Sequence, residues 1–84
     1  MVKVKLRVLF FGRVSDAIGR TLEVAVPEAG CTIAELRRLI SNETHTDVLL
    51  QKGVRASIDR EVVDDEALVR PDAEVAFFSV FSGG

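Results

Sequence analysis

The sequence has little histidine or cysteine, two residue types that often serve as general base or nucleophile. It contains no tryptophan or tyrosine, one histidine and one cysteine among 84 residues. A single cysteine cannot form an internal disulfide, which is typical of a protein kept in a reducing cytoplasm. No stretch approaches the roughly 20 apolar residues of a membrane-spanning helix. Charged residues also interrupt the N-terminus, so we expect no signal peptide, no membrane association and a cytoplasmic location.

An excess of positive charge is also missing. The formal net charge is −2, whereas nucleic-acid binding rests on a positive surface, so we expect no nucleic-acid partner. The charge is nevertheless uneven, with five basic residues and one acidic residue in 1–20, and seven acidic and two basic residues in 59–74. Each run is typical of a solvated face, and either could steer an oppositely charged partner protein.

The apolar pattern predicts a small α+β domain. Alternation over 2–11 and 21–26 indicates two strands, and shorter strands are expected at 54–58, 61–63 and 74–78. One helical turn is expected at 14–18 and another at 47–51. We expect the first and last strands to be parallel neighbours, because they are the longest and most apolar. One main helix then covers one face of the sheet.

That main helix has a clear start signal. Thr32 and Glu35 have the spacing of a capping box, and apolar residues follow at helical spacing until the pattern fades near Asn42. Arg37 and Arg38 are expected to point away from the core. The predicted domain spans 1–78, and residues 79–84 form a tail.

Three groups could suggest chemistry, and each has a simpler structural interpretation. His45 stands alone in a polar stretch, as a solvated loop histidine would. Cys31 precedes the helix and is expected to be a small, partly buried residue at a turn. The run Asp64-Asp65-Glu66 lacks the spacing and glycine of a calcium loop and is expected to be a solvated turn. We therefore expect no bound metal or cofactor.

Strand parity predicts an apolar patch on the outside of the sheet. Neighbouring side chains on a strand point to opposite faces, so Phe10 and Phe11 cannot both lie under the helix. The unbroken apolar row that ends in Phe10 is expected to face the core. Phe11 and Phe78 are then expected to form an outward patch, which Val62 extends. A contiguous patch of this kind often marks an interface.

The C-terminal tail combines apolar residues with a glycine pair. Val80 and Phe81 are expected to contact a partner, since disordered tails are usually polar. Gly83 and Gly84 place the terminal carboxylate on a chain without Cβ atoms, which can enter a narrow channel. Six extended residues reach about 20 Å. The reactive group predicted by this arrangement is the carboxylate of Gly84.

The whole chain resembles the small, sulfur-carrying subunit of molybdopterin synthase, a MoaD-like protein of the ubiquitin-like β-grasp superfamily, which is related to ThiS. The resemblance rests on Val8-Leu9-Phe10-Phe11, on Thr32-Ile33-Ala34-Glu35-Leu36, and on Glu74-Val75-Ala76-Phe77-Phe78 before the final Gly83-Gly84. Related tails often carry a proline pair where this chain has Ser79-Val80. This tail should therefore be more flexible and lose more entropy on insertion.

The resemblance implies a carrier that is not an enzyme by itself. An adenylyltransferase similar to ubiquitin-activating enzymes would adenylate Gly84 with ATP, and a sulfurtransferase would supply a persulfide to form a thiocarboxylate. The patch would dock on the large synthase subunit, which holds the pterin precursor, and two carriers would each deliver one sulfur. Three alternatives remain: a carrier for thiamine synthesis or tRNA thiolation, a ubiquitin-like protein modifier, and a binding module with an inert tail.

Overall fold

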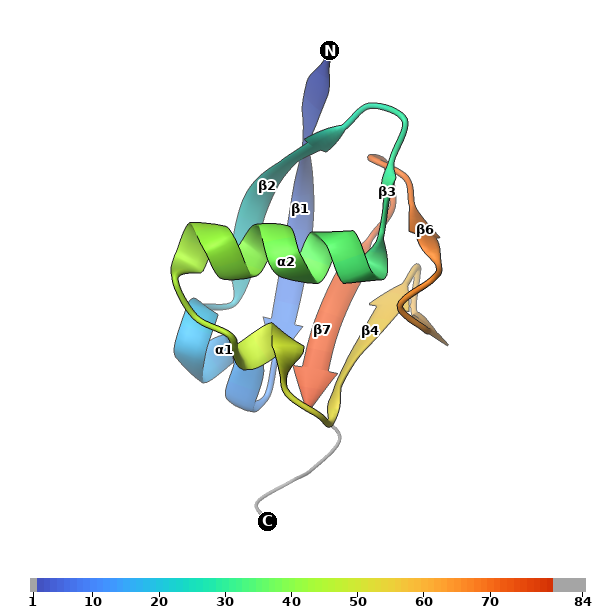
Figure 1. Cartoon of the computed structure of the whole chain (residues 1–84). Helices are drawn as coiled ribbons and strands as arrows, with labels where there is room; N and C mark the ends of the chain where they lie inside the picture. The colour runs from blue at the N-terminus through green and yellow to red at the C-terminus, as the bar shows by residue number, and fades with distance from the viewer. Residues whose placement is uncertain (1, 80–84) are drawn as a thin grey trace.

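The main feature of the structure, a computed structural model that describes residues 2–79, is a five-stranded mixed sheet with helices on one face (Figure 1). Its strand order is β2-β1-β7-β4-β5. The strands are β1 (Lys3–Phe11), β2 (Thr21–Pro27), β4 (Val54–Ile58), β5 (Glu61–Val63) and β7 (Val75–Ser79). β1 and β7 are parallel neighbours at the centre, and every other pairing is antiparallel. This arrangement confirms the predicted α+β, β-grasp architecture.

The main helix, α2 (Ile33–Thr44), begins at the predicted capping box. The hydroxyl of Thr32 accepts a hydrogen bond from the Glu35 amide at 3.1 Å, and the Thr32 amide donates to the Glu35 carboxylate at 2.8 Å. Two donors that a helix start leaves unpaired are thereby satisfied. The helix runs beyond the predicted end near Asn42. His45 follows it as C-cap, in a left-handed conformation with φ of 57°.

Two short helical segments complete this side of the molecule, α1 (Arg13–Ile18) and η1 (Val48–Leu50). The core lies between the helices and the sheet, where apolar side chains of alternate strand residues meet one face of α2. The largest of its fully buried side chains are Phe10, Phe77, Leu6, Ile33, Leu36, Ile40 and Leu49. Burial of such a side chain stabilises the fold by about 1.5–3 kcal/mol. Within residues 2–79, no helix has both the length and the apolar character that crossing a bilayer demands.

A second, two-stranded sheet was not predicted from the sequence. It consists of β3 (Cys31–Thr32) and β6 (Leu68–Val69), paired antiparallel. Gly30, before β3, has φ of 97°, and a Cβ on it would lie 2.5 Å from the carbonyl oxygen of Val69. Glycine therefore allows β3 to approach β6 closely.

Candidate docking face and the root of the tail

The two phenylalanine pairs of β1 and β7 lie on opposite faces of the sheet. Phe10 and Phe77 are buried beneath the helices, with ring centroids 6.2 Å apart and planes at 16°. Phe11 and Phe78 are register partners on the other face, where Phe11 is 54% exposed and Phe78 is half-buried. The predicted parity of both strands is therefore confirmed. The role of the outer pair as an interface stays a prediction.

The apolar patch on this outer face is smaller than the sequence suggested. Leu9, half-buried on the same face of β1, extends it along the strand, and we define the apolar patch as Leu9, Phe11 and Phe78. Val62 is 60% exposed but lies in β5, opposite Ser57 of β4. Because β4 lies between β7 and β5, its polar side chains separate Val62 from Phe78. Val62 is thus a detached apolar side chain on the same sheet.

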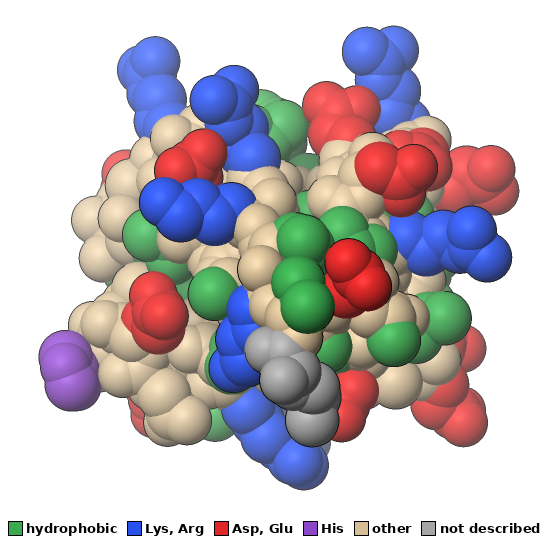
Figure 2. All heavy atoms as spheres, turned by 90° about the horizontal axis from the view of Figure 1, so that it is seen from above, with side chains coloured by type: hydrophobic (Ala, Val, Ile, Leu, Met, Phe, Trp, Pro, Cys, Tyr) green, Lys and Arg blue, Asp and Glu red, His purple; other side chains and the backbone are tan. Residues whose placement is uncertain are grey.

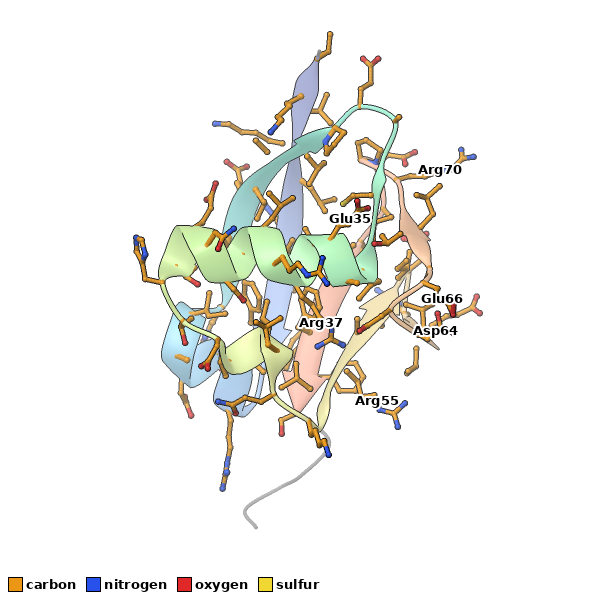
Figure 3. The ribbon with its side chains drawn as sticks, viewed as in Figure 1. Glu35, Arg37, Arg55, Asp64, Glu66 and Arg70 are labelled. Carbon is orange, nitrogen blue, oxygen red and sulfur yellow. The ribbon has the colours of Figure 1, made fainter. Side chains whose placement is uncertain are left out.

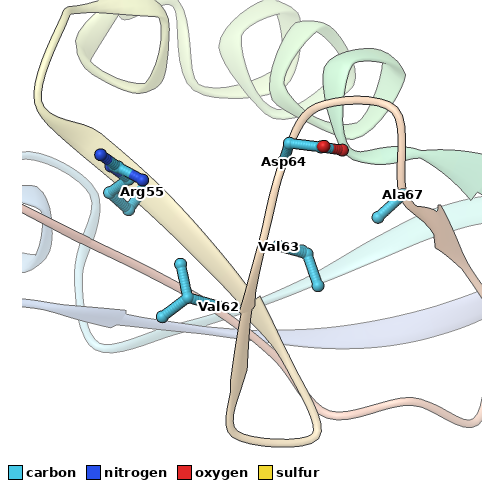
Figure 4. A pocket seen from close by; sticks show the side chains of 5 residues that line it. All are labelled: Arg55, Val62, Val63, Asp64 and Ala67. Carbon is cyan, nitrogen blue, oxygen red and sulfur yellow. The ribbon is translucent and has the colours of Figure 1, made fainter.

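Val62 and a residue that sequence reasoning missed line one open hollow (Figure 4). Arg55 is the register partner of Phe78 and is exposed. The hollow has a volume of about 390 Å³ and is lined by Arg55, Val62, Val63, Asp64 and Ala67. The alternation over 54–58 could have revealed Arg55, since it is the outward charged residue between two buried apolar ones. It places a cation between the apolar patch and Val62.

A second hollow adjoins the patch at the end of β1. It has a volume of about 410 Å³ and is lined by Leu9, Phe10, Phe11, Gly12, Ser15, Arg20 and Thr21. These residues lie where β1, α1 and β2 meet, so the hollow is formed between three secondary-structure elements. Arg20 and Ser15 add polar groups to its lining.

The tail begins beside this patch. β7 ends at Ser79, which pairs with Val54 of β4 and follows Phe78 directly. The strand therefore extends one residue past its predicted end. The predicted functional residues Val80, Phe81, Gly83 and Gly84 lie outside the described residues. A partner that binds the tail would also contact the apolar patch, because Ser79, at the root of the tail, directly follows Phe78.

Arg37 was expected to point away from the core, and this prediction was wrong. Its side chain is only 11% exposed and extends from α2 toward the start of β4 (Figure 3). The guanidinium donates to the carbonyl of Val54 at 2.9 Å, to the carbonyl of Leu49, and to the carboxylate of Asp65 at 2.9 Å. Its carbon Cζ lies 5.4 Å from the ring centroid of Phe77. A planar group with five donors can satisfy several acceptors at once, which explains why an arginine turns inward here.

Arg37 therefore fastens the segments from which the tail starts. Val54 pairs with Ser79, and Phe77 lies two residues before Ser79 in β7. The hydrogen bond to Val54 and the contact with the Phe77 ring therefore both lie at the root of the tail. Charge-assisted hydrogen bonds of this kind contribute about 1.5–3 kcal/mol each. The guanidinium helps to hold the base of the tail in a fixed position relative to α2.

The groups set aside in the sequence have structural roles. Cys31 is 5% exposed in β3 rather than at a turn, and burial, followed by the charge of Glu35, raises the pKa of its thiol. A thiol that stays protonated is a poor nucleophile. His45 is exposed at the end of α2. Asp65 binds Arg37, and no three His, Cys, Asp or Glu side chains of residues 2–79 gather as a metal ion would require.

The sequence profile of the ThiS family matches residues 8–84, which includes the two final glycines. The chain belongs to the ThiS family. No match was found among curated protein sequences.

Solved structures share the fold at low sequence identity. The modifier SAMP1 from Haloferax volcanii has a TM-score of 0.78 at 17% identity, over 96% of this chain and all (100%) of that one. A putative molybdopterin converting factor, subunit 1, from Pyrococcus furiosus has a TM-score of 0.74 at 18% identity, over 90% and 97% of the two chains. The small archaeal modifier protein 1 from Methanosarcina acetivorans has a TM-score of 0.75 at 13% identity, with both chains covered completely (100%). The fold is thus that of small modifier and converting-factor proteins.

Proposed function

We propose that this ThiS-family chain is a sulfur carrier that works through the carboxylate of Gly84. The observation that carries the proposal is the extent of the family match, which runs from β1 through the terminal Gly83-Gly84. The apolar patch beside the root of the tail supports it, because a partner must hold the domain while it processes the terminus. Proteins of this family work with larger partner subunits and activating enzymes.

The chemistry requires activation of an unreactive group. A carboxylate is a poor electrophile, and transfer of AMP from ATP converts it to an acyl adenylate with a good leaving group. The terminal sulfur of a persulfide on the sulfurtransferase displaces AMP and forms an acyl disulfide with Gly84. A thiol, as the reductant, then attacks the other sulfur of this S–S bond, which leaves a thiocarboxylate on Gly84 and a disulfide between the thiol and the sulfurtransferase. In this scheme the activating enzyme binds ATP, and the carrier itself needs no cofactor. The glycines let the terminus pass into the active sites of its partners.

The destination of the sulfur is proposed to be molybdopterin. The fold shared with the converting factor subunit 1 of Pyrococcus furiosus supports this choice, as does the resemblance of the opening and closing strands. The patch of Leu9, Phe11 and Phe78 would dock on the large synthase subunit, with Val80 and Phe81 leading the glycines into it. Thiamine synthesis and tRNA thiolation remain alternative destinations, because their carriers use the same terminus.

A second candidate function is that of a protein modifier. The SAMP1 structures, two of which are described as small archaeal modifier protein 1, share the fold over most of the chain. In that case the activated carboxylate of Gly84 would form an isopeptide bond with a lysine of another protein. The two functions share the activation step and differ in whether sulfur or a lysine amine takes the acyl group.

The test is intact mass measurement after co-expression with the activating enzyme and sulfurtransferase of the same genome. We expect a mass increase equal to replacement of one oxygen by sulfur, located on Gly84 by fragmentation. Cys31→Ser and His45→Ala should load equally, since both residues have structural roles. Sulfur found on Cys31 instead would contradict the proposal. Higher-mass conjugates in the same lysate, lost on deletion of Gly84, would favour the modifier function.

A further inference from the structure

The first strand extends beyond the sheet that it organises. β1 pairs with β2 from Lys3 to Leu9, but β7 pairs only with Val8 to Phe11. The N-terminal half of β1 therefore has β2 on one side and no strand on the other, among the described residues. We call Lys3–Arg7 the basic overhang. It is the upper end of β1 in Figure 1.

Backbone groups of the basic overhang point into this open side. The Phe10 amide donates to the Arg20 carbonyl, and the Glu28 amide donates to the Val2 carbonyl, so even positions of β1 exchange hydrogen bonds with β2. In an antiparallel pair the intervening residues direct their N–H and C=O groups to the opposite edge. For Lys3 and Lys5 that edge has no strand beside it in the described structure.

The basic side chains of the overhang, Lys3, Lys5 and Arg7, are exposed to solvent and form no ion pair with the carboxylates of residues 2–79. They lie on the same face as Leu9 and Phe11, because they share the odd parity of β1. The face of the molecule seen from above carries both basic and acidic side chains (Figure 2). The cations thus continue the apolar patch along one strand.

Two acidic residues limit what can lie beside this edge. Asp72 and Glu74 border a hollow of about 280 Å³ together with Arg7, Leu9 and Ala73. Glu74 also lies 3.8 Å from the guanidinium of Arg60. An occupant would meet negative charge next to Arg7 and uncompensated positive charge next to Lys3 and Lys5. Its acidic side chains must therefore face the two lysines.

The basic overhang lies outside the range that matches the family profile. The family match begins at residue 8, so Lys3, Lys5 and Arg7 all precede it. Lysines on an edge strand commonly prevent unwanted strand pairing. An acidic segment would neutralise them and leave only the unpaired backbone edge, which is suited to strand addition.

We propose that the basic overhang binds an extended, acidic segment of the partner protein that covers the apolar patch. The segment adds to β1 as a strand, places acidic side chains opposite Lys3 and Lys5, and places apolar ones toward the half-buried Val4. The proposal rests on the proposed function only in assigning the segment to that partner. The edge itself can be tested without the partner.

The test is an NMR titration of the full chain with a short peptide of alternating glutamate and valine, and with a lysine-valine peptide as control. We expect the glutamate peptide to shift and protect the amides of Lys3 and Lys5, and the lysine peptide to leave them unchanged. Lys3→Glu/Lys5→Glu should weaken binding by roughly tenfold or more. Arg38→Glu/Lys52→Glu makes the same charge change at exposed cations elsewhere and should bind like the wild type.

Two results would overturn the proposal. Amide shifts spread equally over Arg38, Lys52 and the basic overhang would show attraction by net charge alone. Peptide-induced chemical-shift changes without slower amide exchange at Lys3 and Lys5 would show that no strand is added. The lysines would then serve only to prevent strand pairing at this edge. Failure of the carrier function would appear differently, as a chain that binds the peptide but never gains sulfur on Gly84.

Discussion

Phe10 and Phe77 lie beneath the helices with nearly parallel rings whose centroids are 6.2 Å apart, on the two central parallel strands. Their neighbours in the chain, Phe11 and Phe78, form the register pair on the opposite face. The same two strands therefore supply both the centre of the core and the apolar patch. Substitutions one residue apart should separate folding from partner binding.

Phe10→Asp and Phe11→Asp are the matched pair for this separation. Phe10→Asp should lower the free energy of unfolding by more than about 3 kcal/mol, because it removes a buried ring and buries an unpaired carboxylate. Phe11→Asp should cost about 1 kcal/mol or less. Urea unfolding measures both. Phe11→Asp should still lose binding to the large synthase subunit in a pull-down. An unfolded Phe11→Asp, or one with unchanged binding, would contradict the assignment of the two faces.

Arg37→Met should destabilise the domain by about 2–3 kcal/mol, because the carbonyls of Leu49 and Val54 lose their donor. Arg38→Met removes an equal charge from an exposed position of the same helix and should change stability by no more than about 0.5 kcal/mol. The comparison requires urea unfolding of both variants. An equal decrease in the free energy of unfolding of the two variants would mean that the contacts of the Arg37 guanidinium contribute little to stability.

Gly30→Ala should destabilise the domain more than Gly12→Ala. Both glycines have positive φ, 97° and 66°, so alanine is strained at either position at a cost of about 1–3 kcal/mol. Only at Gly30 would the new Cβ also meet a backbone oxygen, that of Val69, at 2.5 Å. Thermal melts of the two variants test this difference. A smaller loss for Gly30→Ala would show that β3 and β6 can separate easily.

The capping box should give the domain a defined sensitivity to acid. Hydrogen bonding to Thr32, first from its backbone and then from its side chain, lowers the pKa of Glu35 below its ordinary value of 4.5. A lowered pKa in the folded state stabilises the protein above the unfolded value, and this contribution is lost as pH falls through the folded value. Wild-type Tm should therefore fall more steeply than that of Glu35→Gln below about pH 4.5. Glu43→Gln, at the other end of α2, is the matched charge control. If Tm falls with pH equally in the wild type and in Glu35→Gln, the Glu35 carboxylate does not contribute to the acid sensitivity of the domain.

Local patterns in the sequence predicted much of the fold. Alternation along β1 and β7 distinguished the buried Phe10 from the exposed Phe11, and the spacing of Thr32 and Glu35 located the start of α2. The pair β3 and β6 could not be predicted, because two-residue strands show no period and their partner lies far along the chain. The inward turn of Arg37 was missed for a related reason. Its acceptors are carbonyls of Leu49 and Val54, which no side-chain pattern reveals.

The candidate site was predictable only in part. Parity gave the exposed Phe11 and Val62, but not the strand order that separates Val62 from the apolar patch. The basic residues of β1 were visible as a charge run. That β7 pairs with only half of β1, leaving Lys3 and Lys5 at an open edge, depends on register between distant segments. Pairing register was therefore the information that the sequence lacked.

The most direct test of the central claim compares the wild type with a variant that carries one alanine after Gly84. Both are co-expressed with the activating enzyme and the sulfurtransferase, and the intact mass of each chain is then measured. We predict that the wild type gains the mass of one oxygen-to-sulfur exchange on Gly84. The extended variant should gain none, although it melts at the same temperature, because its reactive carboxylate no longer sits on the glycine pair. Equal sulfur loading of the two chains would contradict the carrier function assigned to Gly84.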